Sequence, residues 1–179
     1  MDYYDILIDG ISAEIYVSRI IHTRSWIAAE LSDGRYGIAL HDKLQSRERM
    51  FPTLEGLTAR KAAEAVRSWN LLEASEAMAV INAFYNTEER LDKLSARCGF
   101  DKSCTQGFST EGKKVALIGH LVLQPDALKG ASEVYIIERD PKPGDYPDSA
   151  CEYILPESDI VIMTASAAIN KTLPRLLEL

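Results

Sequence analysis

The sequence predicts an α+β half followed by an α/β half, with domains at residues 1–106 and 107–179. Two observations support this fold class. The first half places β-branched and aromatic segments before helical patterns, and the second half contains short runs that are apolar at every position. An antiparallel sheet with helices suits the first pattern, and a buried parallel sheet suits the second. A polar, glycine-containing stretch over residues 101–112 marks the boundary between them.

The N-terminal half begins with an expected three-stranded antiparallel meander, whose strands lie at residues 15–23, 26–31 and 36–41. Asp33-Gly34 predicts a type I′ hairpin turn, which needs a positive φ at both central positions. A helix is expected over residues 58–70, with one apolar face formed by Ala62, Ala63, Val66 and Trp69.

The next expected helix, over residues 72–85, carries two stripes of side chains. One stripe is apolar and is predicted to face the core. The other is small and polar and consists of Ser75, Ala79, Asn82 and Asn86. This second stripe either faces a wet cleft or forms the solvated side of an ordinary helix.

Residues 113–140 have the pattern of a β-α-β unit, with a helix-compatible piece at residues 125–129 between two apolar runs. Ligands of parallel sheets bind beyond the carboxyl ends of the strands, which places Gly119, His120 and Glu138 at a candidate site. Residues 141–147, PKPGDYP, predict an irregular, rigid loop beside it. A third buried strand is expected at residues 160–163.

Composition excludes several classes of function. The formal net charge of −7 and the scattered Lys and Arg residues argue against a nucleic-acid binder. The acidic N-terminus lacks the features of a signal peptide, and the apolar runs are too short to span a membrane, so we expect a cytoplasmic protein without membrane partners. Three cysteines without paired spacing fit reduced thiols in that compartment.

Three stretches together resemble a known family: SWNLLEASEAMAVINA (68–83), KKVALIGH (113–120) and PESDIVIMTASAAINKTLPRLLEL (156–179). They are similar to bacterial and archaeal proteins of unknown function labelled "putative heavy-metal chelation". The resemblance implies a domain similar to the enolase N-terminal domain, followed by a three-layer Rossmann-like domain, with the active site in the cleft between them. It also implies that this chain has a shortened C-terminus, because the Rossmann-like half of the family normally continues through at least one further strand.

The candidate chemistry leaves several ligands open. Glu138 lies nineteen residues after Gly119, as in dinucleotide sites, but the glycine-rich fingerprint is absent, which favours a nucleoside-like or adenosyl ligand over NAD or FAD. No pair of His or Cys residues shows metal-ligand spacing, and His120 is the most suggestive single candidate for a ligand or for an acid/base group. A histidine at that position can equally cap a loop by backbone hydrogen bonds.

The first hypothesis is therefore a protein that binds a small polar ligand, a divalent or heavy metal ion, or a metal chelate between its domains. Whether it is an enzyme is left open; if it is, His120 and Glu138 are the expected catalytic residues. A second hypothesis is a non-catalytic assembly or regulatory subunit that is completed by homo-oligomerisation, as a dimer, and a third is a nucleoside- or adenosyl-dependent enzyme. The expected ligand-binding residues are Asn70, Glu73, Ser75, Asn82, Gly119, Asp145, Thr164, Ser166, Asn170 and Thr172.

Overall fold

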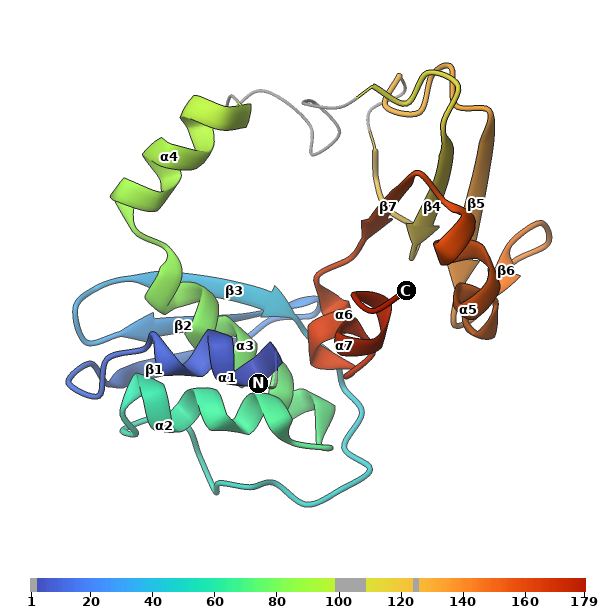
Figure 1. Ribbon diagram of the computed structural model, residues 1–179. Coiled ribbons are helices and arrows are strands. Elements are labelled where there is room, and N and C mark those ends of the chain that lie inside the picture. Colours follow the sequence, from blue (N-terminus) through green and yellow to red (C-terminus); the bar gives the residue numbers. More distant parts are fainter. Residues whose placement is uncertain (1–2, 99–108, 124–125) are drawn as a thin grey trace. The chain divides into compact units, whose positions relative to one another are not determined.

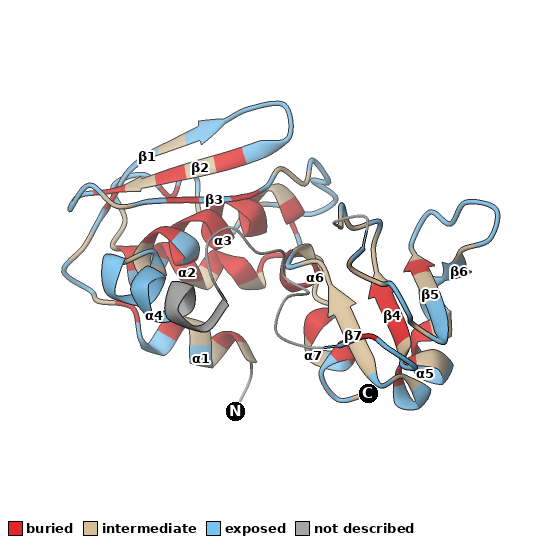
Figure 2. Cartoon of the chain, turned by 90° about the horizontal axis from the view of Figure 1, so that it is seen from above, coloured by how far each residue is buried: buried red, intermediate tan, exposed pale blue. Residues whose placement is uncertain are grey.

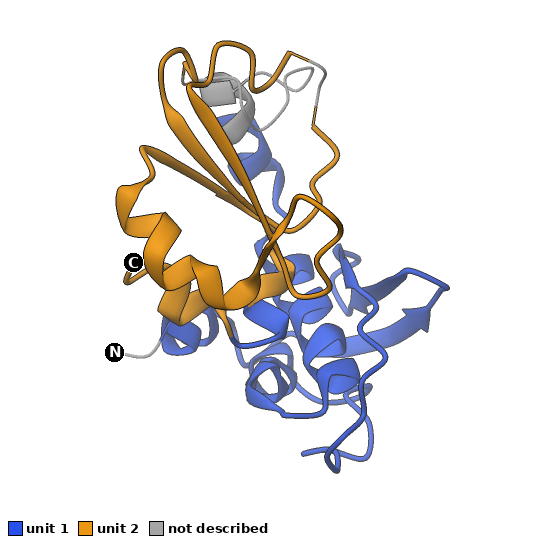
Figure 3. Ribbon diagram, turned by 90° about the vertical axis from the view of Figure 1, so that its right-hand side faces the viewer, with its two compact units in different colours: residues 1–93, 168–171 blue, residues 94–167, 172–179 orange. Residues whose placement is uncertain are grey.

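A computed structural model describes residues 3–98, 109–123 and 126–179, with the backbone alone for residues 94–98 (Figure 1). The chain divides into two compact units (Figure 3). Unit 1 consists of residues 1–93 and 168–171, and unit 2 of residues 94–167 and 172–179. The predicted boundary between residues 106 and 107 lies outside the described residues.

Unit 1 contains the expected antiparallel meander, in the order β1-β2-β3. The strands are β1 (Val17–His22), β2 (Trp26–Leu31) and β3 (Tyr36–Leu40). Its helical elements are α1 (Tyr3–Asp9), α2 (Ala59–Ala63), the 3-10 helix η1 (Glu64–Arg67) and α3 (Leu71–Tyr85), and α4 (Glu88–Cys98) begins in this unit. Helix α1 is an addition to the elements that the sequence predicts.

The core of unit 1 forms where α3 packs against the inner face of the sheet (Figure 2). Nearly every residue of α3 from Leu71 to Ile81 is buried, as expected for a helix surrounded by other elements. Strand β3 alternates, with Gly37 and Ala39 buried against exposed Tyr36, Ile38 and Leu40. The outer face of this sheet therefore carries large apolar side chains.

Two local predictions in unit 1 are wrong. The turn after β2 is not type I′, because only Gly34 has a positive φ, at 84°. Instead Gly34 N donates to Leu31 O and Leu31 N donates to Arg35 O, both at 2.9 Å, which is a three-residue hairpin loop closed by a left-handed glycine. Trp69 is 67% exposed because the helix ends at Arg67, so this residue leaves the apolar face that helical spacing predicts.

Unit 2 is built on a four-stranded parallel sheet in the order β6-β5-β4-β7. The strands are β4 (Lys114–Ile118), β5 (Glu133–Glu138), β6 (Tyr146–Pro147) and β7 (Ile160–Met163). The helical segments are η2 (Asp148–Ala150), α5 (Cys151–Ile154), η3 (Leu155–Glu157), α6 (Ser166–Ile169) and α7 (Leu173–Leu176).

The connections of unit 2 differ from prediction in two places. The piece expected to be helical between β4 and β5 forms hydrogen-bonded turns over Asp126–Gly130. The PKPGDYP segment is not wholly irregular, because Tyr146 and Pro147 pair in parallel with Ile137 and Glu138. A proline is tolerated there because β6 is an edge strand. The three expected apolar strands are otherwise present, with Val115, Ala116 and Ile137 buried.

Candidate functional site

The candidate site lies at the carboxyl edge of the sheet in unit 2. Strands β4 and β5 run parallel with Ile118 opposite Ile137, so the residues that follow them emerge at the same level. Gly119 turns the chain there with a φ of 93°, and its N–H donates to Ile137 O at 2.9 Å. A Cβ at this position would lie 3.2 Å from Thr164 Cγ2, so both the backbone conformation and the space favour glycine.

His120 lies between two carboxylates. Its backbone N–H donates to Glu138 Oε1 at 2.8 Å, and its ring Nδ1 lies 3.3 Å from the same oxygen. Ring Nε2 lies 3.0 Å from Asp145 Oδ2 on the other side. We call His120, Glu138 and Asp145 the His120 cluster. A ring protonated on both nitrogens donates to both carboxylates at once.

Backbone N–H groups hold both carboxylates of the cluster in place. Glu138 Oε2 accepts from Arg139 N at 3.0 Å, and Asp145 Oδ2 accepts from Lys142 N at 2.8 Å. Asp145 N in turn donates to Lys142 O at 2.9 Å, which closes the loop before β6. The Asp145 side chain is only 8% exposed, whereas that of His120 is 35% exposed. The cluster thus consists of two carboxylates that backbone hydrogen bonds hold in place and an imidazole that solvent can reach.

Hydroxyl groups follow the third strand at the same edge. Thr164 N donates to Ile118 O at 3.2 Å, which brings the end of β7 beside the end of β4. Thr164 Oγ1 and Ser166 Oγ are 3.0 Å apart and share a hydrogen bond. Because Thr164 also lies beside Gly119, six predicted residues meet at this edge: Gly119, His120, Glu138, Asp145, Thr164 and Ser166.

The four predicted residues of α3 and its N-cap make hydrogen bonds within unit 1. Asn70 caps α3, with Oδ1 accepting from Glu73 N at 3.1 Å. The fully buried Glu73 carboxylate accepts from Met50 N at 2.8 Å and Phe51 N at 2.9 Å. Ser75 Oγ accepts from Asp42 N at 3.2 Å, and Asn82 Nδ2 donates to Ile38 O at 2.8 Å. These contacts fix loops and an edge strand of unit 1.

The last two predicted residues follow α6. Asn170 belongs to unit 1, whereas Thr172 belongs to unit 2, the unit that contains the His120 cluster. Thr172 occupies the N-cap position of α7, and its backbone N–H donates to Ala167 O at 3.0 Å.

Lys171, between them, was missed by the sequence reasoning. It has a positive φ of 71°, and its ammonium donates to Ile169 O at 2.6 Å. Burial lowers the pKa of this ammonium from 10.5 to about 8, against the opposing effect of the Asp42 carboxylate. Nothing in the letters INKT distinguishes this lysine, because both its backbone conformation and its burial arise from tertiary structure.

The charge of the His120 cluster favours a cationic or metal-bearing ligand, since two carboxylates face one imidazole. The cluster is nevertheless not a preformed site for a bare ion. Glu138 and Asp145 contact opposite nitrogens of the ring, so their lone pairs do not converge on one point. Consistent with this geometry, no group of three or more His, Cys, Asp or Glu side chains is arranged to hold a metal ion in the part of the chain that the structure describes.

The fold and the cluster define a class of α/β protein in which a polar site lies at the carboxyl edge of a parallel sheet. Two family models match the chain, both described as "Putative heavy-metal chelation": DUF4213 over residues 4–85 and DUF364 over residues 108–179. The chain belongs to this DUF364/DUF4213 family. No helix in the described ranges is long and apolar enough to cross a membrane.

Solved structures of the family support the assignment. A protein of unknown function from Desulfitobacterium hafniense DCB-2 is 34% identical, with a TM-score of 0.80, over 98% of this chain and 70% of that one. A protein of unknown function from Pyrococcus horikoshii is 22% identical, with a TM-score of 0.72, over 98% of this chain and 71% of that one, and shows the same fold. A search of curated proteins finds no match.

Proposed function

We propose that this chain binds a small polar ligand, in the first place a metal chelate, at the His120 cluster. The observation that carries this proposal is the imidazole of His120 held between the Glu138 and Asp145 carboxylates at the ends of parallel strands. An imidazole that is about one-third exposed above a buried carboxylate offers a ligand both hydrogen bonding and charge.

The metal in this proposal is cargo rather than a resident cofactor. The divergent carboxylates argue for recognition of an ion that arrives in an organic complex, whose polar groups meet His120 and the hydroxyls of Thr164 and Ser166. The family description, heavy-metal chelation, supports this class of ligand. A cationic complex would also be attracted by the negative charge of the cluster.

Titration with the cationic complex tris(ethylenediamine)nickel(II), followed by calorimetry and native mass spectrometry, tests the proposal, with free Ni²⁺ as the comparison. Wild-type protein is expected to bind the complex more tightly than the free ion. Glu138→Gln and His120→Ala are each expected to weaken binding by at least about tenfold, since each removes a charge-assisted contact.

Glu133→Gln is the matched control, because it makes the same change at the opposite end of β5. It should leave affinity unchanged. Circular dichroism and thermal melting establish that each variant is folded. Equal affinity of wild-type, Glu138→Gln and His120→Ala protein for the complex would refute the assignment.

A second candidate function, a subunit completed by another copy of the chain, is supported by strand β7. Within the described ranges β7 pairs with β4 on one side only, and a free strand edge presents N–H and C=O groups to a partner. Native mass spectrometry at micromolar protein is expected to show a dimer if this role is correct. A monomer at all concentrations would contradict it.

A further inference from the structure

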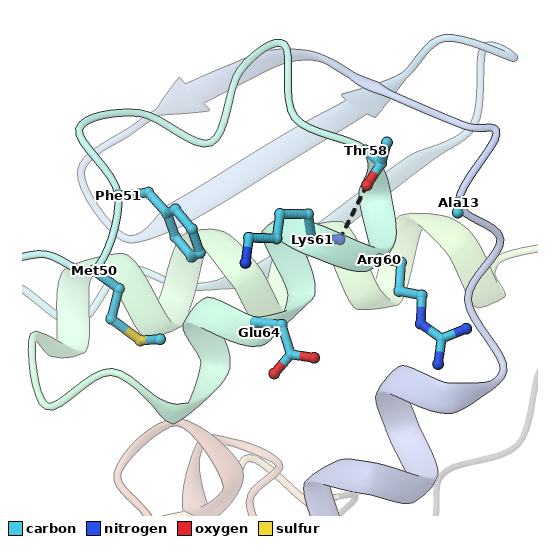
Figure 4. Close-up of a pocket in the computed structure, with 7 residues that line it drawn as sticks. All are labelled: Ala13, Met50, Phe51, Thr58, Arg60, Lys61 and Glu64. Atoms are coloured by element: carbon cyan, nitrogen blue, oxygen red, sulfur yellow. Dashed lines mark hydrogen bonds between the residues drawn. The ribbon is translucent and has the colours of Figure 1, made fainter.

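A concave site lies within unit 1, and none of its lining residues belongs to the His120 cluster (Figure 4). It is a pocket of about 380 Å³, at the lower end of the range found for small-molecule sites. Its walls come from Ala13, the Met50–Phe51 segment and the α2–η1 region. The lining residues are Ala13, Met50, Phe51, Thr58, Arg60, Lys61 and Glu64.

Met50 and Phe51 form the apolar wall of this pocket, and hydrogen bonds hold their backbone in place. The backbone N–H groups of Met50 and Phe51 both donate to the carboxylate of Glu73, which is completely buried. Arg49 Nε donates to Phe51 O at 3.1 Å, and the Arg49 guanidinium pairs with the buried carboxylate of Glu76. The backbone that carries the two wall side chains is therefore positioned before any ligand arrives.

Lys61 supplies an available positive charge. Its ammonium lies 5.2 Å from the centroid of the Phe51 ring, and no carboxylate forms an ion pair with it among the residues that the structure describes. The neighbouring charges are already paired: Arg60 contacts Asp9 at 3.1 Å, and Glu64 contacts Arg67 at 3.3 Å. Figure 4 shows the Lys61 side chain extending toward Phe51, with Met50 near that ring.

The backbone of Lys61 is also fixed. Thr58 caps α2, and its Oγ1 accepts from Lys61 N at 3.2 Å. This cap fixes the first turn of α2, from which the Lys61 side chain leaves toward the pocket.

We propose that this pocket binds a small organic anion with an apolar or aromatic body. The carboxylate or phosphate of such a ligand would pair with the Lys61 ammonium. The apolar body would pack on Met50, which is 50% exposed, and on Phe51. The volume suits a single-ring compound and excludes a helix or a folded partner.

Phenylacetate and phenyl phosphate are suitable probes, with uncharged phenylacetamide as the comparison. Ligand-observed NMR and calorimetry on the full chain are expected to show binding of at least one anion and weaker binding of the amide. Lys61→Gln should weaken binding of the anion by about tenfold, because the counter-ion is lost. Preference for one probe identifies the acidic group that the pocket accepts.

Lys43→Gln removes the same charge from an exposed position outside the pocket and is the matched control. It should bind the anions as wild type does. Met50→Glu, at a half-exposed position of the wall, should abolish anion binding by repulsion without disturbing the core. If neither anion binds wild-type protein, or if Lys61→Gln binds them equally well, the proposal is overturned.

Discussion

At the scale of single residues, the environment of a side chain decides the role that its chemistry allows. Glu73 and Glu138 are both carboxylates that accept two backbone N–H groups. Glu73 is completely buried and fixes a loop, whereas the Glu138 side chain is 23% exposed and meets an accessible imidazole. The same residue type thus supports the fold in one place and a candidate site in the other.

Lys171 provides a residue-scale prediction that depends on pH. Its pKa of about 8 means that the neutral, reactive amine becomes the main form above pH 8. The rate of its reaction with a small acylating reagent, measured by mass spectrometry and corrected for hydrolysis of the reagent, should therefore level off just above pH 8. In urea-unfolded protein the same lysine should return to the ordinary value of 10.5, and its rate should keep rising.

The same shift has a consequence for stability. The unfolded chain binds more protons at Lys171 than the folded chain between about pH 8 and pH 10.5, so the contribution of this residue to stability increases with pH across that window. In the acylation experiment, a Lys171 labelling rate in the folded protein that keeps rising to pH 10 would contradict the lowered pKa.

At the scale of elements, the small polar stripe of α3 has a structural explanation. Asn82 Nδ2 donates to Ile38 O at 2.8 Å, and Asn86 Nδ2 donates to Tyr36 O at 2.9 Å. These carbonyls are on β3, an edge strand of the sheet. The two asparagines of the stripe therefore supply hydrogen bonds to carbonyl groups at the edge of β3 and protect this edge from pairing with another chain. Sequence periodicity located the stripe but not its partner.

Gly37 permits this close approach of α3 to β3, which leads to an element-scale prediction. A Cβ at Gly37 would lie 2.0 Å from Ala83 N, a backbone atom that cannot move aside. Gly37→Ala should lower the free energy of unfolding by more than about 3 kcal/mol, measured by urea denaturation.

Gly34→Ala is the matched control for that experiment. Gly34 has a positive φ, but a Cβ there meets nothing within 4 Å, so only the backbone conformation is penalised. We expect a loss of about 1 to 2 kcal/mol. Equal effects of the two substitutions would contradict the contact between α3 and β3.

At the scale of the whole molecule, neither compact unit is a single continuous stretch of the sequence. Residues 168–171 follow the last strand of unit 2 in sequence but belong to unit 1. The Tyr4 hydroxyl on α1 donates to Ala168 O at 2.7 Å across 164 positions of sequence, in a buried contact. Unit 1 is therefore completed by a segment from near the C-terminus.

Tyr4→Phe tests this connection. Removal of the hydroxyl leaves a buried carbonyl without this donor, and the free energy of unfolding should fall by about 1 to 2 kcal/mol. Tyr153→Phe, at a residue that is 80% exposed, should change stability by less than about 0.5 kcal/mol. If urea denaturation gives equal values for the two variants, the Tyr4–Ala168 bond does not contribute to the fold.

The sequence alone determined the fold class and the location of the candidate site. Apolar runs that end at Gly119 and Glu138, and the meander around Asp33-Gly34, are local patterns, and local patterns report strand order and strand ends. The positions of His120 and Glu138 near one edge followed from the rule that parallel strands end together.

Only the tertiary structure decided which polar residues meet and which support the fold. The ring of His120 reaches Asp145 because β6 pairs with β5, and a two-residue strand containing proline has no recognisable sequence pattern. Glu73 and Ser75 are buried because elements pack around all sides of α3. The pocket at Lys61 and the lowered pKa of Lys171 likewise depend on segments that are distant in sequence, since burial and charge pairing are properties of the folded chain.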